Sequence, residues 1–436
     1  MTTVSAPGYA HWSLPQKIAL RFFFIFFVLY IIFVPSDVLP LYGKVFYPFI
    51  NYFQGFIAWA AKNILHIVIS PVTRGLGDSG GDSTFDYLLY LFVIILSVAA
   101  TIIWSYTGRK TADYNKLFYW LLVVLRYFVA FTMILFGSAK VFRVQFPEPT
   151  IGRLMERVGD MSPMGLAWTY FSYSHAFNYF TGTAELLCAG LLFFRRTTRL
   201  GATIGVVLLV NVVAINYCFD VCVKISSTTL LLMCFFILIP DRGRFLNFFF
   251  RNGEVLPADL SPHRFTEKWK NVTLTGIKYV LILYLLYWAY GLMEEQTATY
   301  GYGGPNAKKP PLYGLYQIET FIINRDTLKP LTTDITRWSK FWINRPGAAA
   351  VKLMNDSIKV YNFKPDTLKH IVAVSTHADT AHQFYLHYTI QKPNVMVLQG
   401  QWKHDSIYVR MHKIDLNSFR LISRGFHMIN EVPYNK

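Results

Sequence analysis

The chain has 436 residues, of which 53% are hydrophobic and 15% are charged, and its mean hydropathy is +0.32. This composition excludes an ordinary soluble domain, because soluble proteins carry about 25% charged residues. The net charge of +17 predicts attraction to anionic lipid headgroups, with no nucleic acid as partner.

Seven apolar segments have, or nearly have, the roughly 20 residues that a helix needs to cross a bilayer. They cover residues 18–34, 87–106, 117–137, 178–194, 200–217, 226–239 and 273–293. The first segment lacks the small-residue cleavage site of a signal peptide, so we expect it to be retained. A further apolar stretch, residues 45–69, is interrupted by polar side chains. It predicts an interfacial or re-entrant helix, and an additional span there remains open.

The distribution of basic residues predicts the orientation of these spans. With the N-terminus in the cytoplasm, every short inner loop is basic, as the positive-inside rule requires. These loops contain Lys17, then Arg109, Lys110 and Lys116, then Arg195, Arg196 and Arg199, and finally Arg242, Arg244, Arg251, Arg264, Lys268 and Lys270. The last span then leads outward, so the residues after Glu294 are expected outside the cytoplasm.

The order of segments predicts five parts of the chain. They are an N-terminal transmembrane hairpin with an interfacial segment (1–116), a four-helix membrane unit (117–240), a basic cytoplasmic loop with the last span (241–293), a Gly/Pro linker (294–312) and a β domain (313–436). The glycine-rich stretch at 74–82 is expected to be a flexible turn. The phenylalanines of 245–250, followed by Arg251, are typical of an amphipathic surface anchor.

The β domain is predicted from short segments rich in Val, Ile, Tyr and Phe. These segments are residues 314–323, 357–363, 371–375, 384–390, 396–401, 407–412 and 419–422. Several alternate apolar and polar residues, which is typical of half-buried strands. The predicted fold class is therefore a mainly α, polytopic membrane protein with a C-terminal antiparallel β-barrel or sandwich of about 120 residues.

One acidic residue, Glu185, lies inside the fourth apolar segment. Ionisable groups inside spanning helices usually face the bundle interior and mark a site. Neighbouring segments supply candidate partners for an outward-facing polar pocket: Arg126, Lys140, Asn211, Asn216 and Asp220. We expect Arg126 to be the inner partner of Glu185. The alternative is that these polar groups only hold the helices together, which is also common in membranes.

The aromatic run at 168–180 contains one histidine, His175. Such a run is typical of an interfacial belt. The alternative function is a flat slot for a quinone or another lipid-soluble ring, with His175 or Glu185 exchanging protons with it.

The remaining reactive side chains suggest no metal site and no covalent framework. Cys218 and Cys222 are four residues apart and are expected to be buried, inert thiols. His377, His382 and His387 recur every five residues, a spacing that does not gather metal ligands on a strand or on a helix. No haem, flavin or iron–sulfur motif is visible in the sequence, which argues against independent catalysis. The cofactor is unknown from the sequence, and a quinone is the candidate that the aromatic run offers.

Short motifs in the middle of the chain resemble the DoxX family of four-helix membrane proteins. They are Arg126, Gly137-Ser-Ala-Lys140, Gly182-Thr-Ala-Glu185-Leu-Leu, Gly190 and Arg196-Thr-Thr-Arg199-Leu-Gly201. The resemblance covers about 117–240 and implies a link to thiosulfate:quinone oxidoreductase and to membrane oxidoreductase assemblies. The segment from Ser423 to Asn435 is similar to the end of long DoxX-like proteins of Bacteroidetes-type bacteria. That similarity implies an inner-membrane location with a periplasmic β domain.

The sequence therefore predicts a quinone-linked or redox-associated membrane subunit. Two alternatives stay open at this point. One is a non-enzymatic envelope scaffold that binds a protein partner through its β domain, and the other is a small-solute or proton-coupled carrier.

Overall fold

A computed structural model describes residues 12–33, 42–67, 69, 81–109, 113–255, 266–299, 306–376, 379 and 382–431, with the backbone alone for 42–51. The chain divides into two compact units, which are described separately: Met1–Ala139 with Phe180–Tyr290, and Lys140–Tyr179 with Gly291–Lys436. Residues 140–179 thus group with the C-terminal part of the chain. Most of the predicted turn at 74–82, and His377, lie outside the described residues.

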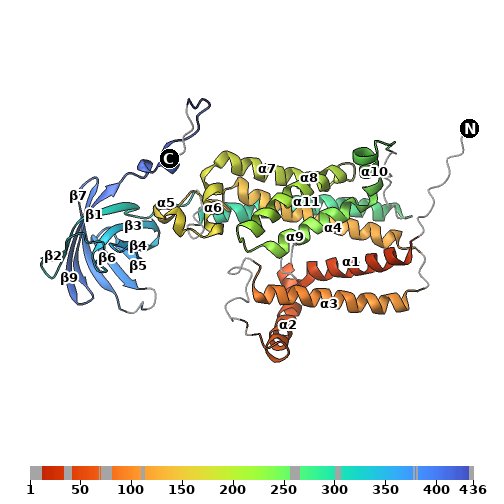
Figure 1. The fold of residues 1–436 in the computed structure, drawn as a ribbon, viewed down its shortest axis with the longest axis horizontal. Helices are drawn as coiled ribbons and strands as arrows, with labels where there is room; N and C mark the ends of the chain where they lie inside the picture. The colour runs from red at the N-terminus through yellow and green to blue at the C-terminus, as the bar shows by residue number, and fades with distance from the viewer. Residues whose placement is uncertain are drawn as a thin grey trace, which may run out of the picture. The chain divides into compact units, whose positions relative to one another are not determined.

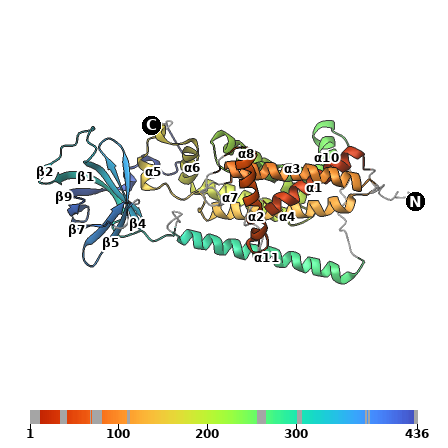
Figure 2. The same cartoon turned by 90° about the horizontal axis from the view of Figure 1, so that it is seen from below.

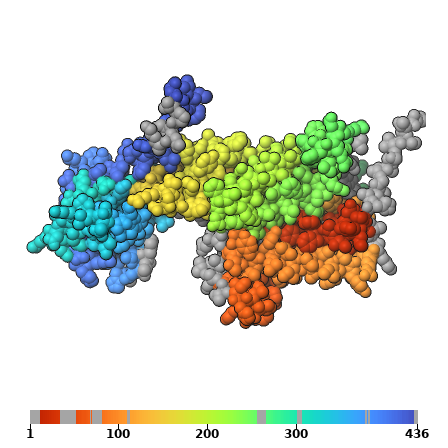
Figure 3. Space-filling model, viewed as in Figure 1, coloured from red at the N-terminus to blue at the C-terminus, as the bar shows by residue number. Residues whose placement is uncertain are grey.

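The first unit is helical (Figures 1 and 2). Its helices are α1 (Leu14–Phe33), α2 (Tyr42–Asn63), α3 (Thr84–Thr107), most of α4 (Asn115–Val141), most of α7 (His175–Leu192), α8 (Thr198–Cys218), α9 (Lys224–Leu238), α10 (Arg242–Leu246) and most of α11 (Lys268–Ala298). In the space-filling view α1 and α3 form one continuous surface (Figure 3). Fully buried side chains such as Phe27, Leu125 and Met233 form the core of this unit.

Within the described ranges, six helical stretches are long and apolar enough to cross a membrane. They are α1, α3, α4, α8, the stretch Lys224–Arg251 and α11. This confirms the predicted polytopic, mainly helical membrane protein. The predicted span at 178–194 is a helix, α7, but it is not among the six, because His175, Asn178 and Glu185 lower its hydropathy. It stays a prediction, as does the interfacial placement of α2.

The second unit contains a closed antiparallel barrel. Its strands are β1 (Gly314–Ile323), β2 (Asp326–Thr327), β3 (Trp338–Arg345), β4 (Gly347–Leu353), β5 (Ile358–Asp366), β6 (Ile371–Thr376), β7 (Phe384–Lys392), β8 (Val395–Trp402) and β9 (Asp405–Ile414). Pairing of β1 with β9 closes the sheet, and β2 is a short extension that pairs with β1. In β9, Ile407, Val409 and Met411 are buried in the barrel core and alternate with more exposed side chains. The predicted β-barrel is confirmed.

Two parts of the barrel prediction are wrong. Strands β3 and β4 were not expected. In β4, the alanines 348–350 favour a helix in isolation, but in the structure these alanine side chains are buried and β4 pairs with β3 and β5. The expected strand at 419–422 is instead a helical turn, α12 (Arg420–Ser423). The side chain of Asp415 accepts a hydrogen bond from the backbone N–H of Asn417 at 3.0 Å, which favours a turn directly after β9.

The segment before α7 packs on the barrel, within the same unit. It contains α5 (Ile151–Met155) and α6 (Pro163–Tyr173). Ile151 of α5 is buried in a small cluster with Leu315, Trp342 and Ala350 of the barrel. An ion pair of 2.6 Å between Arg157 Nη2 and Asp356 Oδ2 adds a polar contact.

We expect the Arg157–Asp356 ion pair to weaken as the pH falls. The Lys352 ammonium, at 2.8 Å, and more weakly Arg157, hold the pKa of Asp356 below its usual value. A carboxyl with a lowered folded-state pKa stabilises above the unfolded-state pKa and loses that contribution as the pH falls through the folded-state value. Protection of the amides around Arg157, corrected for the intrinsic exchange rate at each pH, should therefore decrease as the pH falls below the usual range of a carboxyl group. Asp356→Asn should show the low protection at every pH, and an identical dependence of protection on pH in this variant would contradict the assignment.

Candidate functional site

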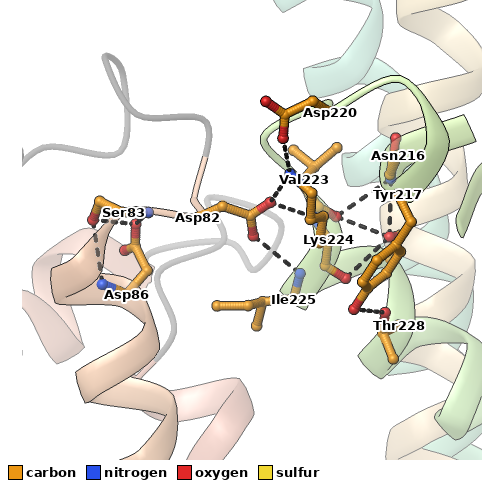
Figure 4. Close-up of polar contacts among 11 residues, drawn as sticks. Asp82, Ser83, Asp86, Asn216, Tyr217, Asp220, Val223, Lys224, Ile225 and Thr228 are labelled. Atoms are coloured by element: carbon orange, nitrogen blue, oxygen red, sulfur yellow. Dashed lines mark hydrogen bonds and ion pairs between the residues drawn. The ribbon is translucent and has the colours of Figure 1, made fainter. Parts of the chain in front are cut away.

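One group of polar side chains lies where α3, α8 and α9 end or begin (Figure 4). Asp82 precedes α3, and its side chain is 5% exposed. Its carboxylate accepts hydrogen bonds from the backbone N–H groups of Lys224 (2.6 Å) and Ile225 (3.0 Å), the first residues of α9. Val223, the residue before α9, makes no capping hydrogen bond with its own side chain. Asp82 thus caps α9 from a distant part of the sequence.

Two predicted pocket residues belong to this group. Asn216 is buried and donates to Ser227 Oγ at 2.9 Å and to the carbonyl of Val223 at 3.4 Å, which joins α8 to α9. Asp220, 82% exposed, lies 2.9 Å from the Lys224 ammonium. Asn211 is exposed on α8 and lies outside the group. These contacts hold the α8–α9 hairpin together and satisfy the polar atoms involved.

Arg126 does not pair with Glu185, so that part of the prediction is wrong. Its Nη1 donates to Thr198 Oγ1 at 3.3 Å, at the start of α8. Helices α4 and α7 are antiparallel, and Gly137 of α4 packs against Gly182 of α7. Glu185 lies one turn beyond Gly182 toward Arg126, so Arg126 lies about 12 Å along α4 from the level of Glu185. Glu185 and Lys140 are each buried, with 5% and 9% of their surface exposed.

The second unit contains an open cavity of about 910 Å³, which we call the groove. It is lined by residues from four stretches of the chain: 148–154, 172–176, 309–313 and 416–430. Its volume lies within the range of about 300–1,000 Å³ that is usual for small-molecule sites. Among the predicted pocket residues, His175 lines this groove.

Glu148 and His175 form the acid–base pair of the groove. Glu148 Oε1 lies 3.4 Å from His175 Nε2 and 3.2 Å from Arg143 Nη1. Arg143 Nη1 also lies 2.6 Å from His175 Nε2. A histidine and a carboxylate side by side, both exposed to the groove, are side chains of the kind that accept and donate protons.

The rest of the lining combines apolar and cationic groups. Leu154 and Phe426 contribute apolar surface, and Lys309 lies with its ammonium 4.9 Å from the ring of Tyr313. Burial and, to a lesser degree, the negative charge of Glu148 raise the pKa of Tyr313. Sequence reasoning missed the lining at 416–430, which it treated as a strand and a tail. Asp415, a residue type that favours turns, could have indicated that the chain leaves the barrel after β9.

The aromatic run beside the groove packs on itself. Phe146 stacks on Phe171 at 4.7 Å between ring centroids and contacts Trp168 at 5.2 Å. Phe177 stacks on Phe171 at 5.8 Å. Because these rings stack on one another, the aromatic run leaves no free ring face between them for a quinone. A quinone site in this unit would therefore lie in the adjacent groove.

The cysteines differ from the expectation in one respect. Cys218 is exposed and Cys222 partly exposed, because α8 ends at Cys218, so the prediction of two buried thiols on one helix face is wrong. Cys188 and Cys234 are buried. In the part of the chain that the structure describes, no three His, Cys, Asp or Glu side chains gather as metal ligands.

Comparison with known proteins gives one relative and no fold assignment. No family model matches the chain, and no solved structure matches it. A protein of Bacillus subtilis described as "Uncharacterized protein YwoB" is 43% identical over 126 residues, which cover 28% of this chain and 79% of the relative. The similarity therefore extends over most of the relative and about a quarter of this chain.

Proposed function

The chain belongs to the family of the Bacillus subtilis protein YwoB. We propose, from the residues of the groove, that this member is a quinone-linked membrane subunit whose groove binds a quinone-type ring. The observation that supports this function is the Glu148–His175 pair, 3.4 Å apart, in a cavity of about 910 Å³. A quinone gains protons when it is reduced and releases them when it is oxidised. Neighbouring acid and base groups at an apolar wall suit that exchange. The resemblance to the DoxX family is consistent with the same function.

In this proposal each lining group has one role. The apolar side chains of Leu154 and Phe426 pack against the ring. His175 and Glu148 exchange protons with a ring oxygen, and Arg143 holds the pair in place through contacts of 2.6 and 3.2 Å.

Binding can be measured with the full-length protein in detergent micelles. We expect a short-chain naphthoquinone to quench tryptophan fluorescence in a saturable manner, because Trp168 and Trp342 lie in the unit that contains the groove. His175→Gln and Glu148→Gln should each weaken the affinity about tenfold, which corresponds to about 1.4 kcal/mol.

The matched control is His404→Gln, which changes an exposed histidine in the turn between β8 and β9. It should bind the naphthoquinone like the parent protein. Quenching that never saturates, or an equal loss in the control variant, would show that the groove is not a quinone site.

We also propose that the protein lies in the bacterial inner membrane with its N-terminus in the cytoplasm and its second unit outside. The basic inner loops support this orientation. Protease added to intact spheroplasts should then release fragments cut within residues 308–313, whereas inverted vesicles should protect that segment. The reverse pattern would contradict the orientation.

A second candidate function, an envelope scaffold that binds a protein partner, is favoured by the C-terminal tail. Phe426, Met428 and Ile429 are 86%, 84% and 76% exposed. Adjacent exposed apolar side chains often mark a protein contact. A photo-crosslinking amino acid at position 428 should then give one discrete adduct in cells, and the absence of any adduct would count against this candidate.

A further inference from the structure

Arg126 is a buried cation whose described contacts are all neutral. It lies in α4 with 9% of its surface exposed. Its Nη1 donates to the hydroxyl of Thr198, and its guanidinium lies 5.1 Å from the ring centroid of Tyr127. Its Nε is buried and has no hydrogen-bond partner. One donor of this guanidinium is therefore left unsatisfied by the described residues.

A second and a third cation lie near Arg126, in the same compact unit. Lys278 of α11 interacts electrostatically with Arg126 and with Arg195 of the α7–α8 loop. The Lys278 ammonium lies 4.5 Å from the ring of Phe194, and among the described residues the charges that act on it are those of Arg126 and Arg195, with no carboxylate. We call Arg126, Arg195 and Lys278 the cation cluster.

The start of α8 adds further positive potential. Arg126 contacts Thr198, the first residue of α8, and Thr197 before it makes no side-chain capping bond. The uncapped N-terminus of a 21-residue helix favours an anion through its backbone N–H groups and its dipole.

The depth of the cluster requires an anion of a particular kind. Arg126 and Lys278 lie about 15–17 Å along α4 and α11 from the first residues of those helices. Cations at such positions in spanning helices are costly unless they meet a counter-charge. The rings of Tyr127 and Phe194 beside them provide apolar surface next to the charges. A phosphate that carries acyl chains satisfies both features.

We propose that the cation cluster binds the phosphate of an anionic phospholipid at the α7–α8 loop. The headgroup phosphate accepts hydrogen bonds from Arg126 Nε and from Lys278, and the acyl chains pack along α11. This site is independent of the groove in the second unit, and neither proposal depends on the other.

The test uses the full-length protein exchanged from detergent into nanodiscs of phosphatidylcholine with a minor fraction of phosphatidylglycerol. Native mass spectrometry after release measures how many lipids of each kind stay bound. We expect the parent protein to retain phosphatidylglycerol in clear preference to phosphatidylcholine. Arg126→Gln and Lys278→Gln should each reduce that retention about tenfold.

Two further variants serve as controls. Lys268→Gln removes one exposed positive charge from the same helix, α11, and should retain the lipid like the parent. Arg126→Lys keeps the charge and should retain most of the lipid, which separates loss of binding from loss of folding. Equal retention of the two lipids by the parent would overturn the proposal.

Inorganic phosphate distinguishes the two possible sources of the anion. Phosphate at millimolar concentration should leave lipid retention nearly unchanged if the acyl chains contribute to binding. If free phosphate instead removes the lipid fully and stabilises the detergent-solubilised protein by itself, the site takes a soluble anion and the lipid proposal is wrong.

Discussion

Asp82→Ala is expected to destabilise the helical unit by about 2–3 kcal/mol. The substitution leaves the backbone N–H groups of Lys224 and Ile225 without the carboxylate that accepts their hydrogen bonds at 2.6 and 3.0 Å. A hydrogen bond to a charged group contributes about 1.5–3 kcal/mol, and an N-cap contributes about 0.5–2 kcal/mol. Unfolding by sodium dodecyl sulfate in mixed micelles measures the loss.

The matched control for this prediction is Asp220→Ala. Asp220 pairs with the same lysine, but its side chain is 82% exposed. Asp220 lies in the turn between α8 and α9, and exposed ion pairs contribute about 0.2–1 kcal/mol. If the two alanine variants lose the same stability, the carboxylate of Asp82 does not cap α9.

Gly137→Ala is expected to weaken the packing of α4 on α7 by about 1–3 kcal/mol, as overpacking usually does. A Cβ at position 137 would lie 2.8 Å from the backbone oxygen of Gly182 and 2.9 Å from Leu186 Cγ. Because the first of these atoms is backbone, the helices must move apart. Thermal unfolding in detergent should show a lower midpoint for the variant.

Gly190→Ala provides the comparison within the same helix pair. A Cβ at position 190 meets nothing within 4 Å, so this variant should match the parent or gain up to about 1 kcal/mol from helix propensity. An equal loss in both variants would mean that the close approach of α4 and α7 does not limit stability.

Periodic patterns explain why much of the fold was predictable. The apolar runs that became α1, α3, α4, α8, α9 and α11 follow from length and hydropathy alone. The alternation in β9 predicted a strand because the barrel buries one face of it. In β4 the alanines gave no such signal, since their burial between two neighbouring strands is a tertiary effect.

The polar residues were harder to place than the helices. Depth along a span suggested that Arg126 and Glu185 would meet, but depth does not give helix rotation or the level at which α4 and α7 cross. Asp82 escaped notice because a distant residue capping α9 leaves no local pattern. The groove was not predictable, because it forms where α5 packs against β3. No motif in either segment indicates that contact.

Photoaffinity labelling with an azido-naphthoquinone tests the central claim, that the groove of the second unit binds a quinone-type ring. The account predicts that the label attaches to peptides containing residues 148–154, 172–176, 309–313 or 416–430, which line the groove, and that excess unlabelled naphthoquinone prevents it. Labelling confined to the helices of the first unit, or labelling that the competitor does not reduce, would contradict the account.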